Sequence, residues 1–425
     1  MSVCDFQLKW YILDPDNHSK LVLPCLAFHR QYNFYQSKPM DYPLTEEQLM
    51  LVDSVRTFVE KELAPYEAEV DRAGEVPESL GAHIKNRAIE LGFYAPNLPE
   101  SIGGGGLDYK SLALFERELG KTSYGLHGYL HRPSEILMAC DGEQIDRYLL
   151  PCVSGEKKEV FALTEPGAGS DIMSMQTKAT RTGDDFIING SKHFISSPVI
   201  PDFAILFAQT GLIETPRGSR KQVTAFLIDA GTPGFTIQRG PRCASQRAYH
   251  TWQLSFEQCR VSANQILGEE HHGFELADKW LKMGRVWVAA AACGKMERLL
   301  SLATSWAAER KQFGQPIGRF QGTSFKLADM ATDLKASDLL VMSAADKADN
   351  GIMTNEDAAM AKLFASEAVG RAADNTIQIY GGMGLMEEMP IERIWRDARL
   401  DRIWDGTSEI QRHIISRSLL RNYNS

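Results

Sequence analysis

Residues 396–412 read RDARLDRIWDGTSEIQR, and this segment organises the 425-residue chain. Its charged first half is typical of a helix end, Asp405-Gly406 of a turn, and Thr407 or Ser408 of the start of a second helix. One acidic side chain, Asp405, therefore lies beside Trp404 on a turn between two helices. We predict that this carboxylate points into a site and acts as a base that removes a proton from carbon.

Composition places the chain among ordinary soluble globular proteins. Hydrophobic residues make up 44% and charged residues 24% of it, and its length suffices for two or three domains. A formal net charge of −9 argues against non-specific nucleic-acid binding, which requires a basic face. No apolar run approaches the roughly 20 residues that span a bilayer, so we expect no membrane segment. Seven scattered cysteines without a C-x-x-C pair indicate neither disulfides nor a metal site and fit a reducing compartment.

Residues 1–39 differ from the rest of the chain. They are rich in aromatic residues and show no clear hydrophobic period. Asp5, Asp14 and Asp16 argue against a transit peptide, which is poor in acidic residues. We expect a poorly ordered leader or an extension of the gene model, with the ordered chain beginning near Met40.

The next segment predicts an all-helical region. Thr45 and Gln48 have the spacing of a capping box, and one α-helical face is marked by Leu49, Val52, Val55, Val59 and Leu63. Further helices are predicted over residues 77–91, 109–120 and 143–150, the last of them before Pro151. The glycine run 103–106 has neither a strand before it nor a lysine-led helix after it, so it predicts a flexible turn rather than a phosphate-binding loop.

Hydrophobic periodicity changes near Phe161 and changes back near Phe274. Strands are predicted over residues 186–190, 203–208, 223–228, 235–237 and 252–256. The basic segment 215–221 predicts a solvated hairpin end, with a phosphate contact as the alternative. Helices are predicted over residues 274 onward, 323–349, 355–380, 391–401 and 408–420. The chain therefore predicts a helical, a β and a second helical region in that order.

Three loops carry candidate cofactor contacts. Residues 161–171 (FALTEPGAGSD) hold free backbone N–H groups that suit a planar ring or an anion, although a structural turn is equally compatible. In residues 310–318, Arg310 could clamp a pyrophosphate and Phe313 could stack on a ring; the alternative is a helix end with cations at its dipole. Residues 378–384 (QIYGGMG) follow a helix and so fail the context of a dinucleotide fold. Adjacent residues rarely converge on one ion, so 269–272 (EEHH) predicts no metal site.

Six motifs in this order resemble the acyl-CoA dehydrogenase family. They are FALTEPGAGSD, NGSKHFIS from Asn189, NQILGExxxGF from Asn264, RKQFGQPIG, QIYGGMG and DGTSEIQR. The resemblance covers residue 44 to the C-terminus. It implies an α+β fold with an N-terminal all-α domain (40–160), a middle β-barrel-like domain (161–273) and a C-terminal four-helix-bundle domain (274–425). It also implies a flavoprotein that binds FAD and acyl-CoA, forms a homotetramer and passes electrons to an electron-transfer flavoprotein. We expect a bacterial-type cytoplasmic protein rather than a mitochondrial matrix protein.

The resemblance also assigns site residues. It implies that Ser170 contacts both cofactor and substrate, that Arg285 and the Gly406 turn lie at the acyl pocket, and that a backbone N–H at residue 405 binds the thioester carbonyl. The implied FAD contacts are Phe161, Leu163, Thr164, Gly169, Ser170, Phe194, Ser196, Arg310, Phe313, Gln378, Gly382, Thr407 and Glu409. Of these, Arg310, Phe313, Gln378 and Gly382 would reach the FAD of a neighbouring subunit.

One departure concerns the base. Most members of the family have Glu where this chain has Asp405, and a subset place the base on the long helix just before its arginine, where this chain has Gly284. Asp405 is thus the candidate base, with a carboxylate withdrawn by roughly 1–1.5 Å, about one C–C bond; the alternative is that it only caps the next helix. The expected reaction is oxidation of an acyl-CoA to a 2,3-enoyl-CoA. The alternatives are an enoyl-CoA reductase, an acyl-CoA lyase or desulfinase, and a non-catalytic flavoprotein.

Overall fold

A computed structural model describes residues 11–13, 20–22, 42–216 and 218–421. Residues 1–39 form one unit by their contacts and residues 40–425 another. In the first unit, β1 (Tyr11–Leu13) pairs antiparallel with β2 (Lys20–Val22). Most of the segment for which a poorly ordered leader is predicted lies outside the described residues.

The first region of the second unit is helical, as predicted. It contains α1 (Glu46–Phe58), a π-helix (Val59–Leu63), α2 (Glu67–Ala73), α3 (Glu78–Glu90), α4 (Tyr109–Leu119), α5 (Tyr124–His127) and α6 (Leu150–Ser154). The capping box of α1 is confirmed, because Thr45 Oγ1 accepts the Gln48 N–H at 3.2 Å and Gln48 Oε1 accepts the Thr45 N–H at 3.2 Å. The helix predicted to end before Pro151 instead continues through it. Pro151 lies in the first turn of α6, where a missing N–H costs nothing.

The glycine run 103–106 is a turn, but the prediction that it is flexible is wrong. The N–H of every glycine in it donates a backbone hydrogen bond, at 2.9–3.0 Å. A Cβ at Gly104 would lie 2.2 Å from the Leu98 carbonyl oxygen. Glycine is therefore required here by close backbone approach.

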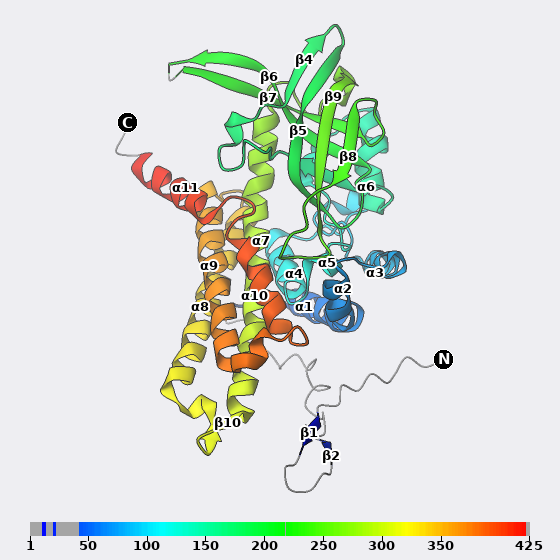
Figure 1. The fold of residues 1–425 in the computed structure, drawn as a ribbon. Coiled ribbons are helices and arrows are strands. Elements are labelled where there is room, and N and C mark those ends of the chain that lie inside the picture. Colours follow the sequence, from blue (N-terminus) through cyan, green and yellow to red (C-terminus); the bar gives the residue numbers. More distant parts are fainter. Residues whose placement is uncertain (1–10, 14–19, 23–41, 217, 422–425) are drawn as a thin grey trace. The chain divides into compact units, whose positions relative to one another are not determined.

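The middle region is a curled seven-stranded sheet (Figure 1). Its strands run in the order β3 (Glu159–Ala162), β6 (Phe203–Thr215), β4 (Lys178–Thr182), β5 (Asp185–Ser197), β9 (His250–Ser262) and β8 (Phe235–Arg239), and β7 (Gly218–Asp229) pairs with β6. Pairing of β6 with β7 extends from Phe203↔Asp229 to Thr215↔Gly218. The predicted solvated hairpin end is confirmed, because Thr215 and Gly218 close the hairpin and residues 218–220 are exposed. Residues 218–221 belong to strand β7 and not to a loop, since the hairpin strands continue beyond the sheet as a projecting ribbon (Figure 1).

The last region is the predicted helical bundle. It comprises α7 (Gly273–Glu309), β10 (Lys311–Gln312), β11 (Gln315–Pro316), α8 (Gln321–Asp349), α9 (Asn355–Tyr380), α10 (Pro390–Asp401) and α11 (Ser408–Leu420). Figure 1 shows α7, α8 and α9 side by side over most of their length. The expected fold class, α+β with two helical regions around a β region, is confirmed.

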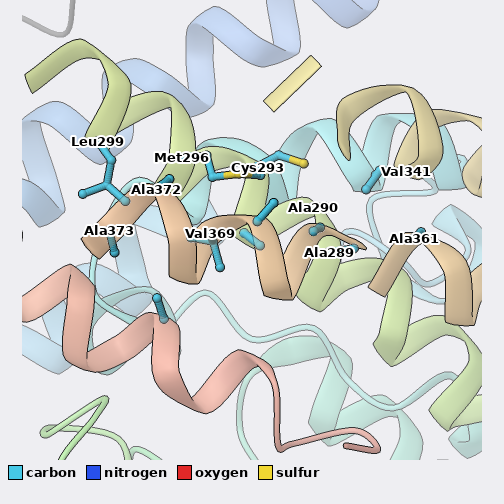
Figure 2. Packing of buried hydrophobic residues seen from close by; sticks show 14 of the residues in the cluster. Ala289, Ala290, Cys293, Met296, Leu299, Val341, Ala361, Val369, Ala372 and Ala373 are labelled. Carbon is cyan, nitrogen blue, oxygen red and sulfur yellow. The ribbon is translucent and has the colours of Figure 1, made fainter. Parts of the chain in front are cut away.

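Small side chains let the bundle helices approach closely. Ala289 and Ala290 on α7 lie close to Val369 and Ala372 on α9, and all four are buried (Figure 2). Helix α4 crosses α7 where both helices lack side chains: a Cβ on Gly294 would lie 1.9 Å from the Arg117 carbonyl oxygen. This close packing fixes α7, and α7 in turn carries part of the site described below.

Candidate active site

The turn between α10 and α11 holds Asp405 in a strained conformation. Asp405 has φ +51° and Gly406 has φ +95°; the first is unfavourable for a residue with a side chain. Three hydrogen bonds from two side chains secure the turn. Gln411 Nε2 donates to the carbonyl oxygens of Asp405 at 3.2 Å and Gly406 at 2.8 Å, and Lys362 Nζ donates to Gly406 O at 2.8 Å. Strain that the surroundings enforce in this way is a frequent mark of a functional site.

The alternative that Asp405 caps α11 is wrong. The N-cap is Thr407, whose Oγ1 accepts the Ile410 N–H at 3.3 Å. Among the described residues, no side-chain or backbone donor forms a hydrogen bond with the Asp405 carboxylate. The carboxylate is therefore left free for another partner.

Asp405 faces α7 at a position without a side chain. A Cβ on Gly284 would lie 3.0 Å from Asp405 Oδ2, closer than most real Cβ contacts. Burial raises the pKa of Asp405 above its ordinary value, while the positive charges of Lys362, Arg285 and Arg132 oppose that rise. The balance leaves a carboxylate with a strengthened affinity for protons, as a general base requires.

Arg285, the residue after Gly284, is buried beside this turn. Its Nη1 donates to Asn355 Oδ1 at 3.3 Å, and its Nε has no partner among the described residues. Burial lowers its pKa, although the nearby Asp278 and Asp405 oppose the change. An unpartnered buried N–H at the predicted acyl pocket is available to a ligand.

Trp404 belongs to an aromatic cluster, centred on Tyr124, that the sequence did not single out. The Tyr124 ring meets the rings of Trp404 at 5.3 Å, Tyr249 at 4.7 Å and His127 at 4.3 Å between centroids. Burial raises the pKa of Tyr124 and of Tyr249, and the Asp405 charge adds to both shifts, so both hydroxyls stay protonated near neutral pH. These residues lie more than 100 positions from Asp405 in sequence, and no local motif marks them.

The predicted cofactor loop 161–171 connects to the same site. The Phe161 ring stacks on Trp280 of α7 at 4.1 Å, one helical turn from Gly284. The buried Lys192 ties the loop down by donating from Nζ to Leu163 O at 2.9 Å and Glu165 Oε1 at 2.7 Å. The His193 N–H donates to Thr164 O at 3.0 Å. Gly169 and Ser170 are exposed, and no backbone hydrogen bond among the described residues uses their N–H groups.

Phe194 and Ser196 lie on β5 beside this loop. Phe194 has φ +54°, is 59% exposed, and sits where the β5–β9 register shifts between Lys192 and Ile195. Ser196 is also exposed, and its carbonyl accepts the Tyr249 hydroxyl at 3.4 Å. A ring that a bulge turns out into solvent is suited to stacking on a planar ligand.

Four predicted cofactor residues lie elsewhere. Phe313, in the β10–β11 hairpin, has φ +51° and is 93% exposed, and Arg310 is exposed just before it. Gln378 and Gly382 are exposed at the C-terminal end of α9. Gln378 is 16 residues beyond Lys362 on α9, a rise of about 24 Å. Within one chain Gln378 therefore lies far from the Asp405 turn, whereas Thr407, the N-cap of α11, and Glu409, in its first turn, are next to it.

Comparisons with known proteins match this architecture. Sequence models described as acyl-CoA dehydrogenase N-terminal, middle and C-terminal domains match residues 45–156, 160–259 and 271–420. The human mitochondrial short-chain specific acyl-CoA dehydrogenase is 39% identical over 94% of this chain and 95% of its own length. The chain belongs to the acyl-CoA dehydrogenase family.

Two further relatives show the range within that family. The caffeyl-CoA reductase-Etf complex subunit CarC of Acetobacterium woodii is 36% identical over 89% of this chain and 99% of its own. The structure of butyryl-CoA dehydrogenase from Megasphaera elsdenii superposes with a TM-score of 0.80 and 36% identity, covering 90% of this chain and 100% of that one. As an acyl-CoA dehydrogenase family member the chain is a flavin-dependent oxidoreductase. The domain boundaries 40–160, 161–273 and 274–425 stay our prediction.

The residues of this acyl-CoA dehydrogenase family chain suit a flavin. Within the described residues the fold leaves the N–H groups of Gly169 and Ser170 without backbone acceptors, and it leaves the Phe194 ring 59% and the Phe313 ring 93% exposed. Among the described residues, no cluster of three or more His, Cys, Asp or Glu side chains could hold a metal ion. In residues 269–272, the His271 ring bonds to Thr210 and the His272 ring to Glu275. No helix in the described ranges is long and apolar enough to cross a bilayer.

Proposed function

We propose that this chain is an FAD-dependent acyl-CoA dehydrogenase that converts an acyl-CoA thioester to its 2,3-enoyl-CoA, with Asp405 as the base. The observation that supports this most directly is the Asp405 carboxylate itself. It is partly buried, held at φ +51°, has a raised pKa, and takes no hydrogen bond from the described residues. A group maintained at such a cost to stability has a use in the reaction.

The cofactor would be held by two sets of residues. The first set would bind the FAD of the same chain and comprises Phe161, Leu163, Thr164, Gly169, Ser170, Phe194, Ser196, Thr407 and Glu409. The second set is Arg310, Phe313, Gln378 and Gly382. The two sets do not meet within one chain. We therefore propose that the second set binds the FAD of a neighbouring copy in a homotetramer. When bound, FAD would supply N5 as acceptor of the hydride from the substrate Cβ.

The residues of the turn would carry out the proton chemistry. Asp405 would take the α-proton from one face of the substrate. The backbone N–H groups of Asp405 and Gly406 take no partner among the described residues, so we propose that the Asp405 N–H donates to the thioester carbonyl. Negative charge grows on that oxygen as the proton leaves, and a preorganised donor stabilises it. Substrate binding would exclude water and raise the pKa of Asp405 further, towards that of the α-proton.

The short side chain of Asp405 constrains the substrate. Its carboxylate meets α7 at Gly284, so the reacting carbon must come close to the turn. Ser170 at the thioester tail and Arg285 beside the acyl group are the proposed further substrate contacts. A close fit among Trp404, Tyr124 and Tyr249 favours a compact or rigid acyl group over a long flexible one.

We also propose an electron-transfer flavoprotein as acceptor and a bacterial-type cytoplasmic location. The A. woodii relative is named as part of an Etf complex.

The same relative, named as a reductase, supports one alternative: physiological reduction of an enoyl-CoA. An anaerobic test separates the two directions. Protein loaded with FAD is mixed with a panel of short, branched, alicyclic and aryl-substituted acyl-CoAs, and the visible flavin absorption and product mass are followed. Bleaching with an enoyl-CoA product two hydrogens lighter supports the dehydrogenase. If no acyl-CoA bleaches the flavin and enoyl-CoAs reoxidise the dithionite-reduced protein, the dehydrogenase proposal fails and the reductase replaces it.

A further inference from the structure

A buried lysine contacts the Asp405 turn from the neighbouring helix. Lys362 lies on α9 and is fully buried, and its Nζ donates to Gly406 O at 2.8 Å. Gln411 Nε2 donates to the same oxygen at 2.8 Å. Two donors from α9 and α11 thus converge on the carbonyl directly after Asp405, at the point where the backbone has positive φ twice in succession.

Within the described ranges, the ammonium group of Lys362 has no direct counter-ion. Among the described residues no carboxylate oxygen lies within 4 Å of it. The nearest acidic groups that act on it are Asp405, Asp401 and Glu367, but Asp401 already bonds Lys295 at 2.7 Å and Glu367 faces Arg402 and Arg412. A buried charge without a pair is unfavourable for folding. Its long-range partner is therefore the Asp405 carboxylate.

We propose that Lys362 is a positioning residue of the reaction: its hydrogen bond to Gly406 O fixes the turn, and its positive charge stabilises the ionised Asp405. This inference rests on the proposed role of Asp405 as the base. Hydrogen bond and charge come from one atom on one rigid helix, so the turn geometry and the ionisation of the base are coupled. Arginine at position 362 would keep the positive charge but not the geometry of the hydrogen bond to Gly406 O. Methionine would keep the side-chain volume but neither the charge nor the hydrogen bond.

The sign of the charge effect follows from the groups around Asp405. Burial raises the pKa of Asp405. Three cations oppose part of this rise: Lys362 on α9, Arg285 on α7 and Arg132 in the loop after α5. Tyr124 and Tyr249 also face it and stay neutral. Removing the Lys362 charge leaves burial less opposed. The carboxylate then stays protonated to a higher pH, where it is no base.

The test compares Lys362→Met and Lys362→Arg with the unaltered FAD-loaded enzyme. The measurement is the rate of anaerobic flavin reduction by the best acyl-CoA of the panel between pH 5.5 and 9, with the flavin spectrum as a check of loading. We expect Lys362→Met to reduce the rate near neutral pH by about 100-fold, and to move the acid limb of the profile to higher pH. Lys362→Arg is expected to lose rate while its acid limb stays in place.

Lys158→Met is the matched control. Lys158 is a partly buried lysine whose Nζ donates to a backbone carbonyl, that of Gly128 at 3.3 Å, and also bonds His131 Nδ1 at 2.5 Å. Desolvation lowers its pKa to about 8, as it does for Lys362. Its loss should lower the melting temperature and leave the acid limb unmoved.

Three outcomes decide the inference. A Lys362→Met enzyme that holds flavin and keeps the wild-type acid limb overturns it. If that variant does not fold, Lys362→Arg decides, since an acid limb displaced upward despite the retained charge also overturns it. Asp405→Asn separates this inference from the proposed function. Full flavin reduction by Asp405→Asn means that the base assignment has failed, whereas an inactive Asp405→Asn beside an unshifted Lys362→Met means that only the role of Lys362 has failed.

Discussion

The carboxylates of Glu67 and Asp405 both lie against α7, and they differ in their hydrogen bonding. Glu67 Oε2 and Oε1 accept from both terminal nitrogens of Arg298 at 2.8 and 2.9 Å, and Oε1 also accepts the Ser123 N–H at 2.9 Å. Asp405 lies beside Gly284 of the same helix and takes no hydrogen bond from the described residues on its carboxylate. The first acid is satisfied by its surroundings, and the second is not.

The difference appears in their pKa values. Burial acts on both carboxyls and would raise the pKa of each. For Glu67, Arg298 and Arg393 outweigh burial, so its pKa is lowered below the ordinary value. For Asp405, burial outweighs Lys362, Arg285 and Arg132, so its pKa is raised. Direct bidentate pairing reverses the effect of burial, whereas more distant cations only reduce it.

The two acids therefore affect stability with opposite signs. A lowered folded pKa means that Glu67 stabilises the fold above its unfolded pKa and that this contribution is lost as the pH falls through the folded value. A raised folded pKa means that Asp405 binds protons more tightly in the folded state. Stability then decreases as the pH rises from the unfolded to the folded pKa of Asp405. Structural acids and candidate catalytic acids can thus be separated by their pH dependence.

The largest expected effect is that of Asp405→Asn. Flavin reduction by acyl-CoA should decrease by about 1,000-fold or more, because loss of a general base costs typically 10²–10⁴. Stability at neutral pH should change little, because removal of the desolvated carboxylate charge is opposed by loss of its long-range attraction to Lys362. Stopped-flow bleaching and thermal unfolding at pH 7 check both parts. Wild-type bleaching, or a clear loss of stability, would mean that Asp405 is a structural acid like Glu67.

Glu67→Gln should show the opposite pattern. Removing the Glu67 carboxylate takes from Arg298 its buried bidentate acceptor and should reduce the free energy of unfolding by about 3 kcal/mol. The pH dependence should also change, since the variant lacks the acid-sensitive contribution of Glu67 around its unfolded pKa. Denaturant unfolding between pH 3 and 7 measures this. The rate of flavin reduction per folded, FAD-loaded molecule should stay near wild type; a specific rate loss would instead assign Glu67 to the reaction.

Gly284→Ala should combine a gain in stability with a loss of rate. Alanine in place of a helix-interior glycine stabilises by up to about 1 kcal/mol. The new Cβ would lie 3.0 Å from Asp405 Oδ2, so the carboxylate must move by a few tenths of an ångström. We expect flavin reduction to slow by about 10-fold with an unchanged or raised melting temperature. A wild-type rate would indicate that the carboxylate is not held against α7.

The helices around the Asp405 turn, and the turn itself, could be predicted from the sequence. The predicted helices 355–380 and 408–420 agree with α9 and α11, because a cap residue and a 3.6-residue period define them locally. The turn with Asp405 and the small-residue face of α7 follow from the same kind of local pattern. Residues 59–63 were predicted as α-helix and form a π-helix, for which the sequence carries no local signal.

The residues around Asp405 could not be predicted from the sequence. Tyr124, Tyr249 and Lys362 come from three different regions of the chain, and only the packing of α5, the β8–β9 connection and α9 brings them to the turn. Lys362 in particular occurs in an alanine-rich helix, where a lysine normally directs its charge to solvent. Its complete burial is a property of the tertiary structure.

The smallest expected effect is a difference in rate between Thr→Ala changes at two helix N-caps, Thr45 and Thr407. Thr45 Oγ1 accepts the Gln48 N–H at 3.2 Å, and Thr407 Oγ1 accepts the Ile410 N–H at 3.3 Å. Either Thr→Ala change should cost about 1 kcal/mol of stability, because one exposed helix N–H loses its acceptor. Thr407 borders the Asp405 turn, so Thr407→Ala should also slow flavin reduction several-fold at saturating FAD, whereas Thr45→Ala should not. Equal rates in the two variants would mean that Gln411 and Lys362 hold the turn without help from the cap, since their bonds to Gly406 O are independent of Thr407.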